Sequence, residues 1–278
     1  MSTELLDGKK LAEEIRDDIK RKVEELSKQN IQPKLSVVTA TSDGGTEFYV
    51  RHIQKAGENT GVKVDVVRLS DSASEQEITK AVQKLASDKT VHGIILQAPV
   101  PNGVNANVIR SHIPIEKDVD GANPQSAGNL ISGLKAFAPS TAVAVMELLK
   151  RYDIPVSGTH SVIIGRSLVV GKPLAHLLLS QDATVTICHS KTRDLKSITR
   201  TADILIVAIG NPSMVDADYI KPGAIVVDVG TSSSDNGLLG DVNHKSMQNV
   251  AGAFSPVPGG VGPVTTSILL KQTIAATN

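Results

Sequence analysis

Short aliphatic runs, typical of buried strands, alternate with helical patterns along most of this 278-residue chain. The first series contains KLSVVTA (34–40), KVDVVRL (63–69) and GIILQAPVP (93–101), and a second series begins with SVIIG (161–165). Ahead of the first strand, apolar residues spaced four and three apart predict an amphipathic helix over residues 8–29. Strands joined by helices form mostly parallel sheets with right-handed crossovers. The alternation therefore predicts an α/β fold.

An irregular stretch separates the two series. Residues 99–140 are rich in Pro, Asn, Gly and Ser, and loops of that length inside a compact domain are uncommon and often functional. A helical pattern at 141–152 leads into the second series, and the tail at 261–278 ends in an apolar helical segment. Local signals agree with this arrangement, since Ser74 and Glu77 predict a capping box at a helix start. We predict two α/β lobes around a cleft.

Composition excludes several classes of protein. The formal net charge is zero, whereas a nucleic-acid-binding protein usually shows a basic excess. The single cysteine, Cys188, excludes an intrachain disulfide and a multi-cysteine metal site, and it fits a reducing compartment. No apolar run approaches the roughly 20 residues that span a bilayer, and the charged N-terminal segment has no signal-peptide core. We expect a cytoplasmic protein that binds no nucleic acid, membrane or metal.

A glycine-containing turn in the second series is a candidate cofactor site. SVIIGRSLVVGKPLAHLLL (161–179) reads as a strand, a turn with Gly165 and Gly171, and a helix. Glycines there let the backbone approach a pyrophosphate, and the helix N-terminus adds N–H donors. The spacing is not G-x-G-x-x-G, so an ordinary tight turn without a ligand stays an alternative.

The end of the next strand bears on the choice of cofactor. NAD-specific sites usually place Asp or Glu there to bind the ribose 2′-hydroxyl. Here TVTIC is followed by His189, Ser190 and Lys191, and Arg166 in the glycine turn could reach the same ribose. A basic and hydroxylic surrounding suits a 2′-phosphate, so NADP is favoured over NAD. The alternative is a solvated strand exit with no ligand.

Several longer motifs occur in an order that resembles one enzyme family. They are QAPVP (97–101), KDVDG (117–121), GRSLVVGKP (165–173) with the later CHSKT, and PVPGGVGPVT (256–265). The chain resembles the methylenetetrahydrofolate dehydrogenase/cyclohydrolase family of the FolD type. One segment departs from the family pattern, because APSTAVA carries Ser140, Ala142 and Ala144 where the family has Cys, Pro and Gly.

The resemblance implies a domain plan, an activity and a set of site residues. It implies a folate-binding catalytic domain (1–140 plus 261–278, with the last helix returning to the first lobe), a Rossmann-like NADP-binding domain (141–260) and a homodimer. It implies hydride transfer from 5,10-methylenetetrahydrofolate to NADP in one-carbon metabolism, then hydrolysis to 10-formyltetrahydrofolate. The implied folate-site residues are Tyr49, Gln97, Asp120, Pro258, Gly259, Gly260, Val261 and Gly262. The implied cofactor residues are Gly165, Arg166, Ser167, Gly171, Pro173, His189, Ser190 and Thr231.

The chemistry of these side chains fits the implied roles. A pterin ring presents an N–H and an amino group side by side, and one carboxylate such as Asp120 can accept both. Tyr49 offers a ring for stacking and a hydroxyl for a polar contact. Each has a plain alternative, namely a turn aspartate and a core tyrosine. Gln97, at a strand end where α/β sheets bind ligands, could equally be a buried amide satisfied by backbone.

One catalytic residue of the family is missing. The family pattern is Tyr, three residues, then Lys, whereas the fifth residue here is Ile53. Residues i and i+4 share a helix face, so Tyr49 and Ile53 are expected to look into the same cleft. Hydride transfer needs no acid or base, but hydrolysis does. We therefore predict a dehydrogenase with weak or absent cyclohydrolase activity. Alternatives are a bifunctional enzyme with a substitute base such as His52, and a non-catalytic relative that binds NADP and folate.

Overall fold

The computed structural model describes residues 3–234 and 237–277, which divide into two compact units. The small-sheet unit comprises Glu13–Ser140 and the residues from Thr266 onward. The large-sheet unit comprises the residues up to Ala12 and Thr141–Thr265. Both are built on parallel strands connected by helices, so the predicted α/β class with a parallel sheet is confirmed.

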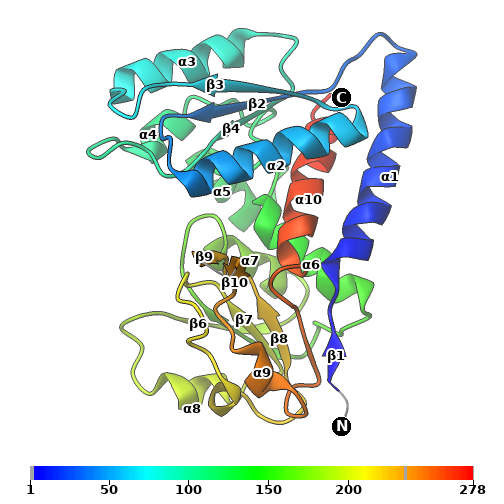
Figure 1. Cartoon of the computed structure of the whole chain (residues 1–278), viewed down its shortest axis with the longest axis vertical. Helices are drawn as coiled ribbons and strands as arrows, with labels where there is room; N and C mark the ends of the chain where they lie inside the picture. Colours follow the sequence, from blue (N-terminus) through cyan, green and yellow to red (C-terminus); the bar gives the residue numbers. More distant parts are fainter. Residues whose placement is uncertain (1–2, 235–236, 278) are drawn as a thin grey trace. The chain divides into compact units, whose positions relative to one another are not determined.

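The small-sheet unit is built around three parallel strands in the order β3-β2-β4 (Figure 1). Their bounds are β2 (Lys34–Thr39), β3 (Lys63–Arg68) and β4 (Gly93–Leu96). Figure 1 shows two helices on opposite faces of this sheet, α2 (Gly44–Thr60) and α3 (Glu75–Ser87). Because both faces are covered, the strand β4 is buried at every position, as continuous apolar strands should be.

Local signals set several helix ends in this unit. The predicted capping box is confirmed, because Ser74 Oγ accepts the Glu77 N–H while the Glu77 carboxylate accepts the Ser74 N–H. The helix predicted over residues 8–29 is α1 (Gly8–Ser27), which ends before the left-handed Asn30 (φ 59°).

The stretch 99–140, predicted to be irregular, contains two short helices, which corrects that interpretation. They are α4 (Ala106–Arg110) and α5 (Pro124–Ile131). Asn105 and Asn123 start them, because each side-chain oxygen accepts an N–H of the first turn.

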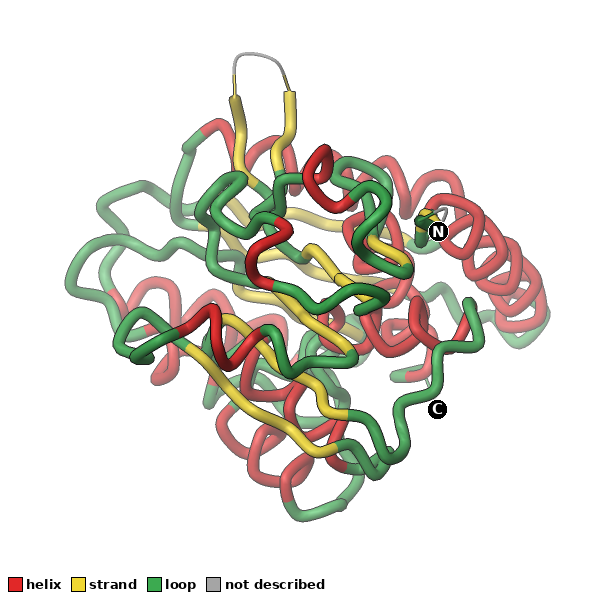
Figure 2. Tube along the Cα trace, turned by 90° about the horizontal axis from the view of Figure 1, so that it is seen from below, coloured by secondary structure: helices red, strands yellow, loops and turns green. Residues whose placement is uncertain are grey.

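The large-sheet unit contains parallel strands in the order β1-β11-β8-β7-β5-β6. Their bounds are β1 (Glu4–Leu5), β5 (His160–Ile164), β6 (Thr184–Cys188), β7 (Ile204–Val207), β8 (Ile225–Asp228) and β11 (Ala253–Phe254). A separate antiparallel hairpin, β9 (Ser232–Ser234) with β10 (Gly237–Leu239), extends away from the sheet (Figure 2). The core is aliphatic, and Val162, Leu205 and Val226 from three adjacent strands are completely buried in it.

The remaining helices are α6 (Ser140–Arg151), α7 (Gly171–Leu179), α8 (Leu195–Thr199), η1 (Ala217–Tyr219), α9 (His244–Met247) and α10 (Val261–Ala275). Within the described part of the chain, no helix is both long and apolar enough to cross a bilayer. The same residues contain no group of His, Cys, Asp or Glu arranged to hold a metal ion.

Candidate functional site

Tyr49 lies on α2, whose start is fixed by Asp43. The Asp43 carboxylate accepts the Gly45 and Thr46 N–H groups at 3.0 Å each, which satisfies two free donors of the first turn. Tyr49 is half-buried beside the buried stripe of this helix. Burial raises the pKa of its phenol, and the charge of the Asp120 carboxylate raises it further. The phenol therefore stays protonated at neutral pH and is a hydrogen-bond donor in the neighbourhood of Asp120.

Asp120 belongs to a pair of aspartates held by backbone N–H groups. The buried Asp118 carboxylate accepts N–H bonds from Ala122 (3.1 Å) and Asn123 (2.9 Å). Asp120 Oδ1 accepts the Ser140 N–H at 3.4 Å. Burial raises the pKa of Asp120 to about 6, and the neighbouring Asp118 adds to this shift. Asp120 is therefore a carboxyl group that changes charge close to physiological pH.

Gln97 follows β4 at the carboxyl end of the small sheet. Its backbone N–H donates to Val38 O at 2.9 Å, which continues the strand ladder, and the Ala98–Pro99 peptide bond shortly after it is cis. The side chain is half-buried, and its Nε2 donates to Ala98 O at 2.8 Å. The amide is thus bonded to the backbone, as the plainer interpretation of this residue required, and it lies at the strand edge where the folate role was predicted.

On α2, Ile53 is buried whereas its neighbour His52 is exposed. Ile53 is completely buried within the stripe that includes Val50 and Gly57. His52 is exposed and stacks on Phe48, with ring centroids 6.4 Å apart and planes 12° apart. Partial burial, with smaller effects of nearby cationic side chains, lowers the pKa of His52. The histidine considered as a substitute base therefore lies on the exposed side of α2, away from the stripe that holds Ile53.

The predicted cofactor turn connects β5 to α7, and close backbone packing requires its glycines. Gly165 has φ 129°, and a Cβ atom there would collide with the Ala208 carbonyl oxygen. A Cβ atom at Gly171 would collide with the Gly165 carbonyl oxygen. Ser167 Oγ accepts the Val170 N–H at 3.1 Å and so closes the turn. Both glycines are therefore needed for the fold of the turn, whatever it binds.

The other predicted cofactor residues lie at the carboxyl ends of the large-sheet strands, apart from Pro173, which is buried in the first turn of α7. Arg166, Ser167, Ser190 and Thr231 are exposed, and His189 is half-buried. The His189 N–H donates to Thr192 Oγ1 at 2.8 Å, and its Nδ1 accepts the Lys191 N–H at 3.1 Å. This edge of an α/β sheet is where nucleotides bind. The accessible guanidinium and hydroxyl groups suit an anionic phosphate.

The PGGVG segment packs against the start of α1 in the large-sheet unit. Gly259 has φ 112°, and its carbonyl accepts the Gly8 N–H at 2.8 Å. A Cβ atom at Gly8 would collide with Gly260 O, and the Gly260 N–H donates to Pro256 O at 2.8 Å. Pro258 follows a cis peptide bond, and α10 begins at Val261 and includes Gly262. The segment is therefore a hydrogen-bonded turn that packs closely on the start of α1.

Two buried aspartates hold the loops that follow β7 and β8, and neither was predicted from the sequence. Asp228 accepts the Gly230 and Asp241 N–H groups at 3.0 Å each. Asp241 accepts the backbone N–H groups of residues 209–210 at 2.7 and 3.0 Å. The loop fixed in this way continues into Thr231. An acid that directly follows an apolar strand run, as in IVVD, is the signal that could have identified Asp228.

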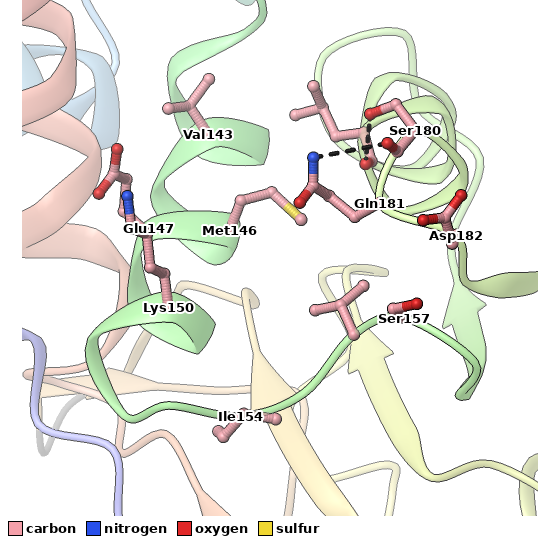
Figure 3. Close-up of a pocket in the computed structure, with 11 residues that line it drawn as sticks. Val143, Met146, Glu147, Lys150, Ile154, Ser157, Ser180, Gln181 and Asp182 are labelled. Atoms are coloured by element: carbon pink, nitrogen blue, oxygen red, sulfur yellow. Dashed lines mark hydrogen bonds between the residues drawn. The ribbon is translucent and has the colours of Figure 1, made fainter.

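A depression of about 550 Å³ in the large-sheet unit lies between α6 and the segment that follows α7. Figure 3 shows Met146 of α6 and Gln181 pointing toward one another across it. The charged side chains that line it include Glu147, Lys150 and Asp182. Among the described residues that line it, none is a predicted site residue, so it is not the predicted nucleotide site.

Comparison with known proteins connects both halves of the chain to one family. Residues 6–120 match "Tetrahydrofolate dehydrogenase/cyclohydrolase, catalytic domain", and residues 139–278 match "Tetrahydrofolate dehydrogenase/cyclohydrolase, NAD(P)-binding domain". The chain is 48% identical over 272 residues to the "Bifunctional protein FolD" of Parafrankia sp., with 98% of each chain covered.

Solved structures agree with this connection. The FolD methylenetetrahydrofolate dehydrogenase/cyclohydrolase of Campylobacter jejuni superposes with a TM-score of 0.96 at 39% identity, covering 99% of each chain. The Trypanosoma brucei methylenetetrahydrofolate dehydrogenase-cyclohydrolase, complexed with NADP and an inhibitor, gives a TM-score of 0.95 at 34% identity, covering 100% of this chain and 98% of that one.

Proposed function

The chain belongs to the tetrahydrofolate dehydrogenase/cyclohydrolase family, and we infer that it is an NADP-dependent methylenetetrahydrofolate dehydrogenase. We further propose that its cyclohydrolase activity is weak or absent, and that it acts as a cytoplasmic homodimer on tetrahydrofolate derivatives. The match of both halves of the chain supports the dehydrogenase. The single observation behind the weak cyclohydrolase is the buried aliphatic side chain of Ile53.

The proposed folate-site residues bind and orient the substrate. Above its pKa, the Asp120 carboxylate accepts the paired N–H donors of the pterin. The protonated phenol of Tyr49 and the amide of Gln97 border the reacting ring. When the methylene carbon loses hydride, the lone pairs of the two flanking nitrogens stabilise the resulting cation, so no protein acid or base is needed. Juxtaposition of the reacting groups provides most of the acceleration.

The cofactor residues match the requirements of NADP. When bound, NADP supplies the hydride acceptor. Gly165 and Gly171 leave room for the backbone of the turn to approach a pyrophosphate, and the positive end of the α7 helix dipole lies at this turn. Arg166 and Ser190, both exposed, are proposed to hold the 2′-phosphate.

The hydrolytic step lacks an evident catalyst. Water must add to the methenyl carbon and a proton must reach the departing nitrogen, work for which acid–base catalysis typically contributes about 10²–10⁴-fold. Ile53 can neither donate nor accept a proton, and His52 stacks on Phe48 at the exposed side of the helix. A bifunctional enzyme with a substitute base is the second candidate, since the Parafrankia relative is named bifunctional.

Two steady-state rates of the purified protein distinguish a dehydrogenase with weak cyclohydrolase activity from a bifunctional enzyme. One is NADP reduction with 5,10-methylenetetrahydrofolate, and the other is hydrolysis of 5,10-methenyltetrahydrofolate. We expect rapid reduction with hydrolysis near the uncatalysed rate. Rapid hydrolysis that His52→Ala abolishes would establish the bifunctional enzyme instead.

The affinity for folate is expected to depend on pH through Asp120. Its pKa is raised to about 6 in the unliganded protein, and the pterin donors bind only the carboxylate form. The KM for methylenetetrahydrofolate should therefore be constant above pH 7 and should rise as the pH falls through about 6. The KM for NADP, measured in the same buffers, is the internal control. A folate KM that stays flat from pH 8 to 5 would contradict this role.

Arg166→Ala is expected to raise the KM for NADP about tenfold, because one charge-assisted hydrogen bond contributes roughly 1.5–3 kcal/mol. The weaker reaction with NAD should change little, since NAD has no 2′-phosphate. Arg200→Ala is the matched control, as Arg200 is also exposed but precedes the amino end of β7. Equal losses with both cofactors would assign Arg166 to another role.

A further inference from the structure

The side chain of Gln272 connects two backbone segments in the small-sheet unit. Gln272 lies on α10, and its Nε2 donates to Val119 O at 2.6 Å, to Ala138 O at 3.2 Å and to Ser140 Oγ at 3.3 Å. Two of these acceptors are carbonyl oxygens, which cannot donate. The amide nitrogen, and not the amide oxygen, must therefore face them.

Both connected segments hold Asp120. Val119 is buried and directly precedes Asp120 in the chain. Ser140 is buried, and its backbone N–H donates to Asp120 Oδ1 at 3.4 Å. One amide group therefore bonds the residue before the carboxylate and the residue that donates to it.

The two segments are in direct contact at this point. Gly121 has φ 55°, and a Cβ atom there would collide with Phe137 O and lie 2.8 Å from the Pro139 nitrogen. On the following side, the Asp118 carboxylate holds the Asn123 N–H at 2.9 Å. The chain on both sides of Asp120 is therefore held in place, and Gln272 is the residue of α10 that takes part in this.

We propose that Gln272 is a positioning residue for the folate-binding carboxylate of Asp120, an inference that rests on the proposed function. A side-chain amide has the required chemistry, because its NH₂ group supplies two hydrogens to a cluster of acceptors. Without it, the carbonyls of Val119 and Ala138 lose a part-buried donor, and such loss is costly. The carboxylate then has no fixed direction from which to accept two parallel N–H bonds.

The first test is Gln272→Leu, which keeps the approximate size of the side chain and removes the donor. We expect the KM for methylenetetrahydrofolate to rise about tenfold, while the KM for NADP and kcat at saturating folate stay within twofold of wild type. The matched control is Gln76→Leu, at an exposed position on α3 in the same unit. A folate KM unchanged from that control overturns the proposal, as does an equal loss in kcat and both KM values.

A second variant keeps the test decisive if Gln272→Leu folds poorly. Gln272→Glu has the same shape, but its carboxylate would face the carbonyl oxygens of Val119 and Ala138. Protonation restores one donor, so we expect the folate KM of this variant to fall from pH 8 toward pH 6.5, where wild type changes little. A variant whose folate KM follows the wild-type pH profile overturns the proposal.

Direct titration of the wild-type protein with tetrahydrofolate distinguishes a failure of the proposed function from a failure of the proposed role of Gln272. Wild-type protein that neither binds tetrahydrofolate nor reduces NADP would overturn the proposed function and this role with it. Wild-type protein that does both, with Gln272→Leu unimpaired in both, would overturn the role of Gln272 alone.

Discussion

Replacing Asp120 by asparagine should raise the KM for methylenetetrahydrofolate by about 100-fold or more. The variant loses the carboxylate proposed to accept two pterin N–H bonds, and hydrogen bonds to charged groups contribute roughly 1.5–3 kcal/mol each. An asparagine amide also presents its own NH₂ donor to one of the pterin donors. Steady-state kinetics with varied folate and saturating NADP would measure the change.

Two comparisons make the Asp120→Asn result specific. The KM for NADP should remain close to wild type, because the predicted cofactor residues lie in the large-sheet unit. Asp17→Asn, at a surface position of α1 where the carboxylate pairs with Lys20 at 2.8 Å, should change neither KM. A folate KM within threefold of wild type in Asp120→Asn would remove Asp120 from the binding site.

Ile53→Lys is expected to raise methenyltetrahydrofolate hydrolysis by about 100-fold or more, within the usual range for a positioned acid–base group. A fully buried position lowers the pKa of an introduced lysine. This shift keeps part of the amine neutral at pH 7 and able to exchange protons. The same burial should lower the melting temperature, since an ammonium group is costly to remove from water.

Ile53→Met is the matched control for that gain. It is unbranched like lysine and places no ionisable group in the core, so its hydrolysis rate should equal that of the wild type. Dehydrogenase activity should survive in both variants. If Ile53→Lys folds and hydrolyses no faster than Ile53→Met, the absence of lysine at this position does not explain a weak cyclohydrolase.

Sequence patterns predicted the helices that are determined by residues close together in the chain. The spacing of apolar residues predicted α1 almost to its ends, and Ser74 with Glu77 predicted the start of α3. The strand β1 could not be predicted, because Glu4–Leu5 is too short for a periodic pattern and pairs with Ala253–Phe254 at the other end of the chain. A pairing of that kind depends on the finished sheet and not on neighbouring residues.

In the candidate site, too, the sequence predicted which residues to consider but not the contacts that depend on the fold. Motif comparison predicted a folate-site role for Asp120, but not the contacts that orient its carboxylate. Gln272 is one of several polar residues on α10, and only the fold brings it to Val119 and Ser140. Helical spacing placed Ile53 one turn after Tyr49, yet its complete burial is a property of the folded unit that the spacing does not predict.

The tyrosines give the protein an optical signal of its own. The chain has no tryptophan and three tyrosines, so its ultraviolet emission comes from Tyr49, Tyr152 and Tyr219. The Tyr152 hydroxyl is hydrogen-bonded to the backbone of Asp7, and the Tyr219 ring lies 5.0 Å from the Lys196 ammonium. Neither of these two tyrosines is a predicted folate-site residue. A folate ring that stacks on Tyr49 should quench one emitter of the three, and Tyr49→Phe would remove that response without any label.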